Sequence, residues 1–226
     1  MSMWTLVIAL VSALIVWFLL ARQLTARPWL LAGQVGYSAD IEPTSKPAKK
    51  VALYFLLAAI SSLFTLFFTA YIMRMDAHHG GGGDWHTIPK PGILWLNTLL
   101  LIGASAAMQW AKSTLSFRGG AYLKTALMIA GVFTLAFLAG QLVAWQELHN
   151  IGSLHLSNPA LGFFYLLTGV HALHLLGGLY VWARALVRVC LGITTPSINL
   201  SVQLCTVYWH YLLLVWLILF GLLLTT

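Results

Sequence analysis

The sequence predicts an all-α membrane protein, a bundle of six transmembrane helices, from two observations. The first is composition: 60% of the 226 residues are apolar and only 8% are charged, whereas a soluble domain carries about 25% charged residues. A single domain of this size cannot bury so much apolar surface away from water. The second is a set of six long apolar stretches without Asp, Glu, Lys or Arg, each close to the length that crosses a bilayer. They cover residues 4–20, 51–73, 93–111, 125–145, 160–181 and 204–224.

The first stretch has the length of a signal peptide but lacks a basic leader, because the first three residues carry no positive side chain. Its positive charges, Arg22 and Arg27, follow the apolar run instead. We therefore expect a retained helix whose N-terminus faces outside. The connection after it contains three prolines and ends in a basic cluster. The chain is thus expected to comprise a first helix (1–22), a cytoplasmic Pro-rich linker (23–50) and a five-helix core (51–226).

The basic residues orient the predicted helices in the membrane. Of the 12 Lys and Arg residues, only Arg74 and Lys90 lie outside three alternate connections. Cytoplasmic loops carry such an excess of Lys and Arg. With six spans, this bias places both termini outside. The orientation of the chain in the membrane then explains the net charge of +7, and no nucleic-acid partner is expected.

The acidic residues argue against some functions. All five, Asp40, Glu42, Asp76, Asp84 and Glu147, lie in predicted loops or at span ends. Proton relays and ion-coupled transporters need ionisable groups at membrane depth. The sequence therefore argues against a proton pump or ion-coupled transporter that works through this chain alone.

Three histidines lie within the predicted spans and have several interpretations. His171 and His174 are three residues apart and so share one helical face near mid-membrane. His210 lies six residues from the predicted cytoplasmic end of its span, at Leu204. Two of them could ligate a haem, all three could bind a metal, or each could make structural or lipid contacts. We favour the last interpretation, and we predict no catalytic, cofactor-binding or metal-ligating residue.

The run Gly103-Ala104-Ser105-Ala106 also has two interpretations. It faintly resembles the serine loop of rhomboid intramembrane proteases, and His210 could then act as the base. Rhomboid proteases carry Gly after the serine, however, where this chain has Ala106. Small residues of this kind also permit a close helix–helix contact, which is the interpretation we favour.

Tryptophans near the predicted span ends indicate an interfacial aromatic belt. The expected members are Trp4, Trp85, Trp145, Trp182 and Trp209.

Four segments, in order, resemble subunit III of the haem-copper terminal oxidases. They are Phe67-Phe68-Thr69-Ala70-Tyr71-Ile72-Met73-Arg74, then Leu94-Trp95-Leu96-Asn97-Thr98, then the run from Phe163 to Gly178 with Thr168-Gly169-Val170-His171 and His174, and finally Tyr208-Trp209-His210-Tyr211 followed by Val215-Trp216. The likeness runs from about Val51 to the end of the chain.

The resemblance implies a subunit with no haem, no copper and no active site of its own. It would pack on subunit I, which holds the oxygen-reducing centre, in a complex that also contains subunit II and a small subunit IV. Haem and copper would lie in the partner subunits. The complex would pump protons in the aerobic respiration of a bacterium, in its inner (plasma) membrane.

The resemblance also implies bound phospholipid, with His210 and Arg74 as candidates for lipid contact and His171 and His174 as candidates for polar helix packing. Two departures bear on proton uptake. Many members of the family carry Glu in the span that corresponds to residues 51–73, and Asp three residues after the final-helix histidine. Here the span has no carboxylate and Leu213 occupies the second position, so a proton-antenna role is not expected.

These features predict a non-catalytic subunit III of a cytochrome c oxidase that stabilises the catalytic subunit. Subunit III of a quinol oxidase, or a subunit associated with a nitric oxide reductase, is the alternative. A rhomboid-like protease is a distant third.

Overall fold

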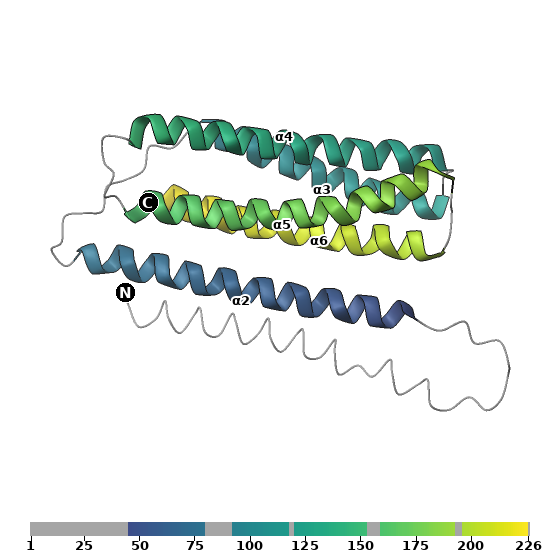
Figure 1. Ribbon diagram of the computed structural model, residues 1–226, viewed down its shortest axis with the longest axis horizontal. Coiled ribbons are helices and arrows are strands. Elements are labelled where there is room, and N and C mark those ends of the chain that lie inside the picture. Colours follow the sequence, from purple (N-terminus) through teal and green to yellow (C-terminus); the bar gives the residue numbers. More distant parts are fainter. Residues whose placement is uncertain (1–44, 80–91, 118–119, 153–158, 193–195, 226) are drawn as a thin grey trace, which may run out of the picture. The chain divides into compact units, whose positions relative to one another are not determined.

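A computed structural model describes residues 45–79, 92–117, 120–152, 159–192 and 196–225, which form five α-helices (Figure 1). The helices are α2 (Ser45–His79), α3 (Ile93–Phe117), α4 (Gly120–Gly152), α5 (Pro159–Cys190) and α6 (Pro196–Thr225). Each is long and apolar enough to cross a membrane. The all-helical class is thereby confirmed. The first predicted span, residues 4–20, lies outside the described residues, so the count of six spans and the outward termini stay predictions.

The helices extend beyond the apolar stretches that predict them. Helix α2 begins at Ser45, so the last six residues of the segment assigned to the linker are helical. Helices α5 and α6 each begin at a proline, whose fixed φ suits the first helical turn and whose missing N–H would have no partner there. Helix α5 ends at Cys190, and Gly192, with φ of 71°, closes it by donating to the Val189 carbonyl over 3.1 Å.

Helix α6 begins earlier than its apolar run predicts. The candidate span of α6 is Ile198–Leu224, rather than a stretch that begins at Leu204, because the polar side chains of the first helical turns hid the true start of the helix. The expected place of His210 near the cytoplasmic end of the membrane stays a prediction.

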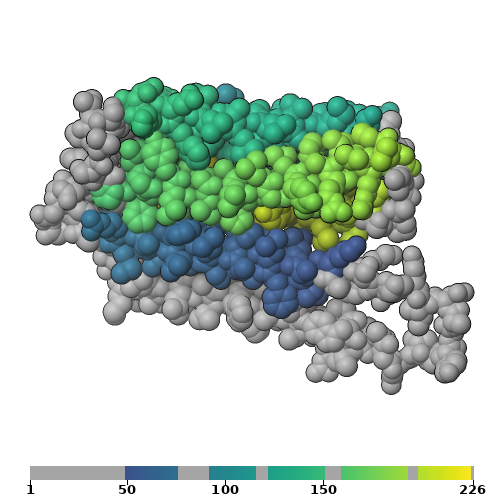
Figure 2. All heavy atoms as spheres, in the orientation of Figure 1, coloured from purple at the N-terminus to yellow at the C-terminus, as the bar shows by residue number. Residues whose placement is uncertain are grey.

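The chain divides into two compact units, Met1–Leu63 and Phe64–Thr226, and the second contains the four complete helices α3 to α6. Within it, α3 packs on α4 and α6, and α5 packs on the same two helices, which closes a four-helix ring (Figure 1). On the face shown in Figure 2, α4 and α5 lie side by side over most of their length. The second unit also includes the end of α2, from Phe64.

Small residues let the helices of the ring approach closely. Ala104 and Ser105 are buried, and the ring of Phe133 in α4 lies directly over Gly103 in α3. In the same way, the Trp182 ring of α5 covers Gly131 of α4. The helix-contact interpretation of the run that begins at Gly103 is therefore confirmed.

One tryptophan of the predicted aromatic belt belongs to the core instead. Trp209 is fully buried, and its indole N–H donates to the Thr134 hydroxyl in α4 over 3.1 Å. The assignment of Trp209 to the interfacial belt was wrong, because its indole faces a neighbouring helix in the core. Trp145 and Trp182 are half-buried and also donate to neighbouring helices.

Candidate functional site

A layer of buried polar side chains crosses the ring near the end where α3 begins. The indole N–H of Trp216 in α6 donates to the Thr98 hydroxyl in α3 over 3.0 Å, and Thr98 donates to the Leu94 carbonyl over 2.9 Å. Beside Thr98, the Asn97 amide nitrogen donates to Gln141 Oε1 in α4 over 3.3 Å. All four of these polar side chains are buried. The layer ties α3 to both of its neighbours in surroundings where an unmade hydrogen bond is costly.

His171 in α5 lies beside this layer and is fully buried. Its ring centroid is 5.5 Å from that of Trp216, 6.0 Å from that of Phe137 and 6.4 Å from that of Phe64. Neither ring nitrogen has a hydrogen-bond partner among the described residues. The imidazole therefore lies in an aromatic cage contributed by α2, α4 and α6.

His174, one turn further along α5, is half-buried and has a defined tautomer. Its Nδ1 lies 2.7 Å from the Val170 carbonyl oxygen, and because a carbonyl only accepts, Nδ1 carries the proton. The ring is 5.7 Å from that of Phe64. The backbone carbonyl of His174 accepts a hydrogen bond of 3.0 Å from the Tyr208 hydroxyl of α6. His171 and His174 thus share Phe64 as a neighbour, as their spacing on one helical face predicts.

His210 in α6 has two partners, both in α3. Its Nε2 lies 3.2 Å from Gln109 Oε1. Because an amide oxygen only accepts, Nε2 carries the proton, and Nδ1 then accepts from the Ser105 hydroxyl, with which it is in hydrogen-bond contact. Both nitrogens of a neutral imidazole are used in this way. Gln109 and His210 are nevertheless exposed on the outer surface of the ring.

The three histidines do not converge on one site. The partners of His210 come from α3, whereas His171 and His174 lie against α2, α4 and the side chains of Trp216 and Phe64. The residues that the structure describes contain no group of three or more His, Cys, Asp and Glu side chains placed to hold a metal ion. The lipid contact expected of His210 stays a prediction.

The contact between Ser105 and His210 meets only one of the requirements of the protease alternative. It is the pair of side chains that such an enzyme needs. Ser105, however, lies in the middle of the continuous helix α3, whose peptide N–H groups are occupied by the helix itself. An acyl-transfer enzyme needs free donors there to stabilise the developing oxyanion. The pair therefore acts as a polar contact between helices.

Hydrogen bonds from aromatic side chains join the remaining helix pairs. Between α4 and α5, the Trp145 indole donates to the Thr168 hydroxyl (3.0 Å), the Tyr165 hydroxyl to the Trp145 carbonyl (3.2 Å), and the Trp182 indole to the Leu127 carbonyl (3.1 Å). Between α5 and α6, the Tyr208 hydroxyl donates to the His174 carbonyl. Sequence reasoning missed these hydrogen bonds. The available signal was threonine within apolar stretches that also contain tryptophan, since a buried indole N–H needs an acceptor.

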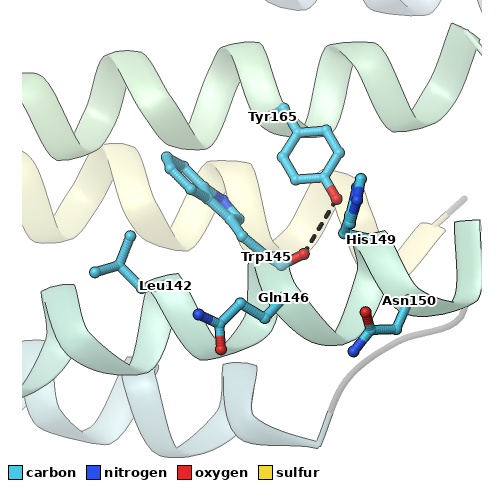
Figure 3. A pocket seen from close by; sticks show the side chains of 6 residues that line it. All are labelled: Leu142, Trp145, Gln146, His149, Asn150 and Tyr165. Carbon is cyan, nitrogen blue, oxygen red and sulfur yellow. Dashed lines mark hydrogen bonds between the residues drawn. The ribbon is translucent and has the colours of Figure 1, made fainter.

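An open pocket of about 520 Å³ lies between the end of α4 and the beginning of α5 (Figure 3). Leu142, Trp145 and Tyr165 form its apolar wall, and polar side chains complete it: Gln146, His149 and Asn150. The hydroxyl of Tyr165 donates to the Trp145 carbonyl, as drawn in Figure 3, and the two rings meet edge to face at 6.0 Å. Because the span of α4 ends at Asn150, the pocket lies at the end of the membrane-crossing part. An apolar wall with a polar edge at this depth suits an amphipathic molecule.

Arg74, the other candidate for lipid contact, is exposed near the end of the span Lys49–Met75 in α2. A guanidinium at this depth can reach the head-group region.

Together, the spanning helices and the internal use of their polar side chains define a multi-pass helical membrane protein. A family model described as cytochrome c oxidase subunit III matches residues 2–224. The chain belongs to the cytochrome c oxidase subunit III family, as its motifs predict. The family match begins well before Val51, where the likeness of the motifs starts, and so includes the first predicted span.

Two relatives illustrate the similarity. A protein named probable cytochrome c oxidase subunit 3 from Mycobacterium tuberculosis (strain ATCC 25618 / H37Rv) is 30% identical over 165 residues, which cover 71% of this chain and 81% of the mycobacterial protein. Cytochrome c oxidase subunit 3 of Synechocystis sp. (strain PCC 6803) is 30% identical over 168 residues, which cover 73% of this chain and 70% of the cyanobacterial protein.

Proposed function

We propose that this chain is the non-catalytic subunit III of a proton-pumping cytochrome c oxidase and that it stabilises the catalytic subunit I during aerobic respiration. The family match over residues 2–224 carries the proposal. The arrangement of polar side chains supports it, because buried Thr, Asn, Gln and Trp side chains join the helices of the ring to one another. Haem and copper belong to the partner subunits, and subunits II and IV complete the complex in a bacterial inner membrane. Six spans place both termini outside.

The exposed pair Gln109 and His210 supports a surface for subunit I on the outside of the ring. Both side chains are exposed within the candidate spans of α3 and α6, where polar groups that face hydrocarbon are costly. Such residues normally face other protein, and polar side chains join helices within membranes. We therefore propose that subunit I packs against the α3–α6 face.

Replacing His210 by leucine is expected to loosen the α3–α6 contact beneath this interface without changing the chemistry. The variant removes the contacts to Ser105 and Gln109, each contributing about 0.5–1.5 kcal/mol net. Initial oxygen reduction should stay near the wild-type rate, while the complex loses activity sooner during turnover or releases this chain in detergent. Oxygen consumption followed to exhaustion, with gel analysis of retained subunits, measures both effects.

Gln203→Leu is the matched control for His210→Leu. Gln203 is also exposed on α6, and it lies two turns from His210 on the same side of the helix. The control should behave as wild type. An immediate loss of most oxygen reduction in His210→Leu, with the chain still bound, would contradict the proposal, because it would place His210 on the path of electrons or protons.

A bound phospholipid is the second proposed feature, and the pocket between α4 and α5 favours it. Its aromatic and aliphatic wall fits an acyl chain, and its amide and imidazole groups can bond to the glycerol or phosphate region. Arg74 supplies a further contact for phosphate at the end of α2.

The double variant Gln146→Leu/His149→Leu is expected to retain less phospholipid per chain than the wild type. Quantitative lipid mass spectrometry of the detergent-purified complex measures this ratio. Glu147→Gln is the control, because Glu147 is exposed between the two positions but does not line the pocket. An unchanged lipid ratio in the double variant would remove the pocket from the proposal and leave only Arg74 as a site for head groups.

A further inference from the structure

Four polar atoms in the core of the ring lack a partner. Among the described residues, the buried side-chain atoms without a hydrogen bond are Asn97 Oδ1, Gln141 Nε2, and both ring nitrogens of His171. They come from three different helices, α3, α4 and α5. The side chains of Asn97 and His171 are 0% exposed and that of Gln141 is 2% exposed. No side chain of another subunit can therefore reach them.

The three side chains lie at one level of the ring. The indole of Trp216 donates to Thr98, the neighbour of Asn97, and its ring is 5.5 Å from that of His171. The same indole is 4.8 Å from the ring of Phe137, which lies one turn from Gln141 in α4. The Asn97 amide, finally, is bonded to Gln141 directly. Trp216 thus connects the amide pair to the imidazole.

A glycine in α4 makes room for a polar side chain in this layer. The Asn97 oxygen lies directly over Gly140, where any Cβ would collide with it.

Together, the unpartnered atoms offer the hydrogen-bond donors and acceptors of a water-binding site. Asn97 Oδ1 accepts, Gln141 Nε2 donates, and a neutral imidazole has one nitrogen of each kind. Leaving such a group unpaired in the interior costs about 1–3 kcal/mol, and this layer contains four. Buried waters in proteins typically make about three hydrogen bonds to groups of this kind. A metal ion fits poorly, because the layer offers only one imidazole and two neutral amides.

We propose that the ring encloses a small cluster of ordered water, in which one molecule joins Asn97 Oδ1 and Gln141 Nε2 to a nitrogen of His171. This water connects α5 to the α3–α4 pair at a level where His171 makes no hydrogen bond to another described residue. A second molecule of the cluster satisfies the other nitrogen of His171. The aromatic cage of Phe64, Phe137 and Trp216 separates the cluster from the lipid.

Cryo-EM density of the wild-type protein, purified with the subunits that it retains, tests the proposal at a resolution that shows ordered water. A peak is expected at about 2.7–3.2 Å from Asn97 Oδ1 and Gln141 Nε2 and from one His171 nitrogen. An imidazole in contact only with carbon atoms, with no peak beside the amide pair, would overturn it. This measurement needs no variant and so does not depend on folding of an altered chain.

A double-mutant cycle gives an independent test. His171→Phe keeps a ring in the cage and removes both nitrogens, and Gln141→Leu removes the opposite partner of the bridging water. We expect His171→Phe to lower the midpoint of thermal unfolding by a few degrees in the wild-type background and by clearly less in Gln141→Leu. An equal shift of the midpoint in the two backgrounds, or a higher midpoint for His171→Phe in the wild-type background, would mean that no water is bound to the imidazole. Either result would overturn the proposal.

Discussion

Replacing Gly178 by alanine is expected to destabilise the bundle, whereas the same replacement at the neighbouring Gly177 is not. A Cβ at position 178 would lie 2.8 Å from Tyr208 Cε1, 3.1 Å from Tyr208 Cδ1 and 3.3 Å from Trp209 Cζ3. A Cβ at position 177 would have nothing within 4 Å. The two variants gain the same intrinsic helix propensity, about 1 kcal/mol, so the difference between them measures packing alone.

The neighbours of Gly178 are held in place and cannot make room at low cost. Tyr208 is tied by its hydroxyl to the His174 carbonyl, and Trp209 is fully buried with its indole N–H on Thr134. Inserting a methyl group into such a core costs about 1–3 kcal/mol.

Thermal unfolding of the purified protein in detergent, followed by tryptophan fluorescence, measures the effect. The midpoint should fall for Gly178→Ala and stay level or rise for Gly177→Ala. Equal midpoints for the two variants would show that α5 and α6 are not in close contact at Gly178, and the four-helix ring would then be wrong at this interface.

The sequence predicts all five described helices because charged residues are excluded from the hydrocarbon. It predicts their ends less well, since the last turns of a membrane helix are polar and resemble loops. The start of α6 is an example: the apolar run begins at Leu204, but the helix begins at Pro196.

The sequence also cannot separate the lipid face of a helix from its core face. In a soluble helix, polar residues mark the outside, whereas here both faces are apolar. Trp209 could therefore be mistaken for an interfacial residue, although it lies in the core. The sequence alone suggests Ser105 and His210 as a possible pair. The partnership of Gln109 with the same imidazole, and the layer of Asn97, Gln141 and Trp216, depend on which helices are neighbours, and only the structure shows this.

Removing this chain from the oxidase is the second change from which we expect a large effect. The proposal gives the chain no part in electron transfer or oxygen chemistry, so those reactions should continue without it. In the proposal, the bundle is instead a rigid neighbour for subunit I, joined internally by hydrogen bonds such as those of Trp209 and Trp216. Without that neighbour, the catalytic subunit should inactivate after several-fold fewer turnovers.

The time course of oxygen consumption by the complex with and without this chain tests the central claim most directly. The proposal predicts equal initial rates per haem, an earlier loss of activity in the depleted complex, and recovery of the longer lifetime when the purified chain is added back. An initial rate that is nearly abolished by removal of the chain, with all other subunits and haems retained, would contradict the proposal and assign the chain a direct part in the reaction.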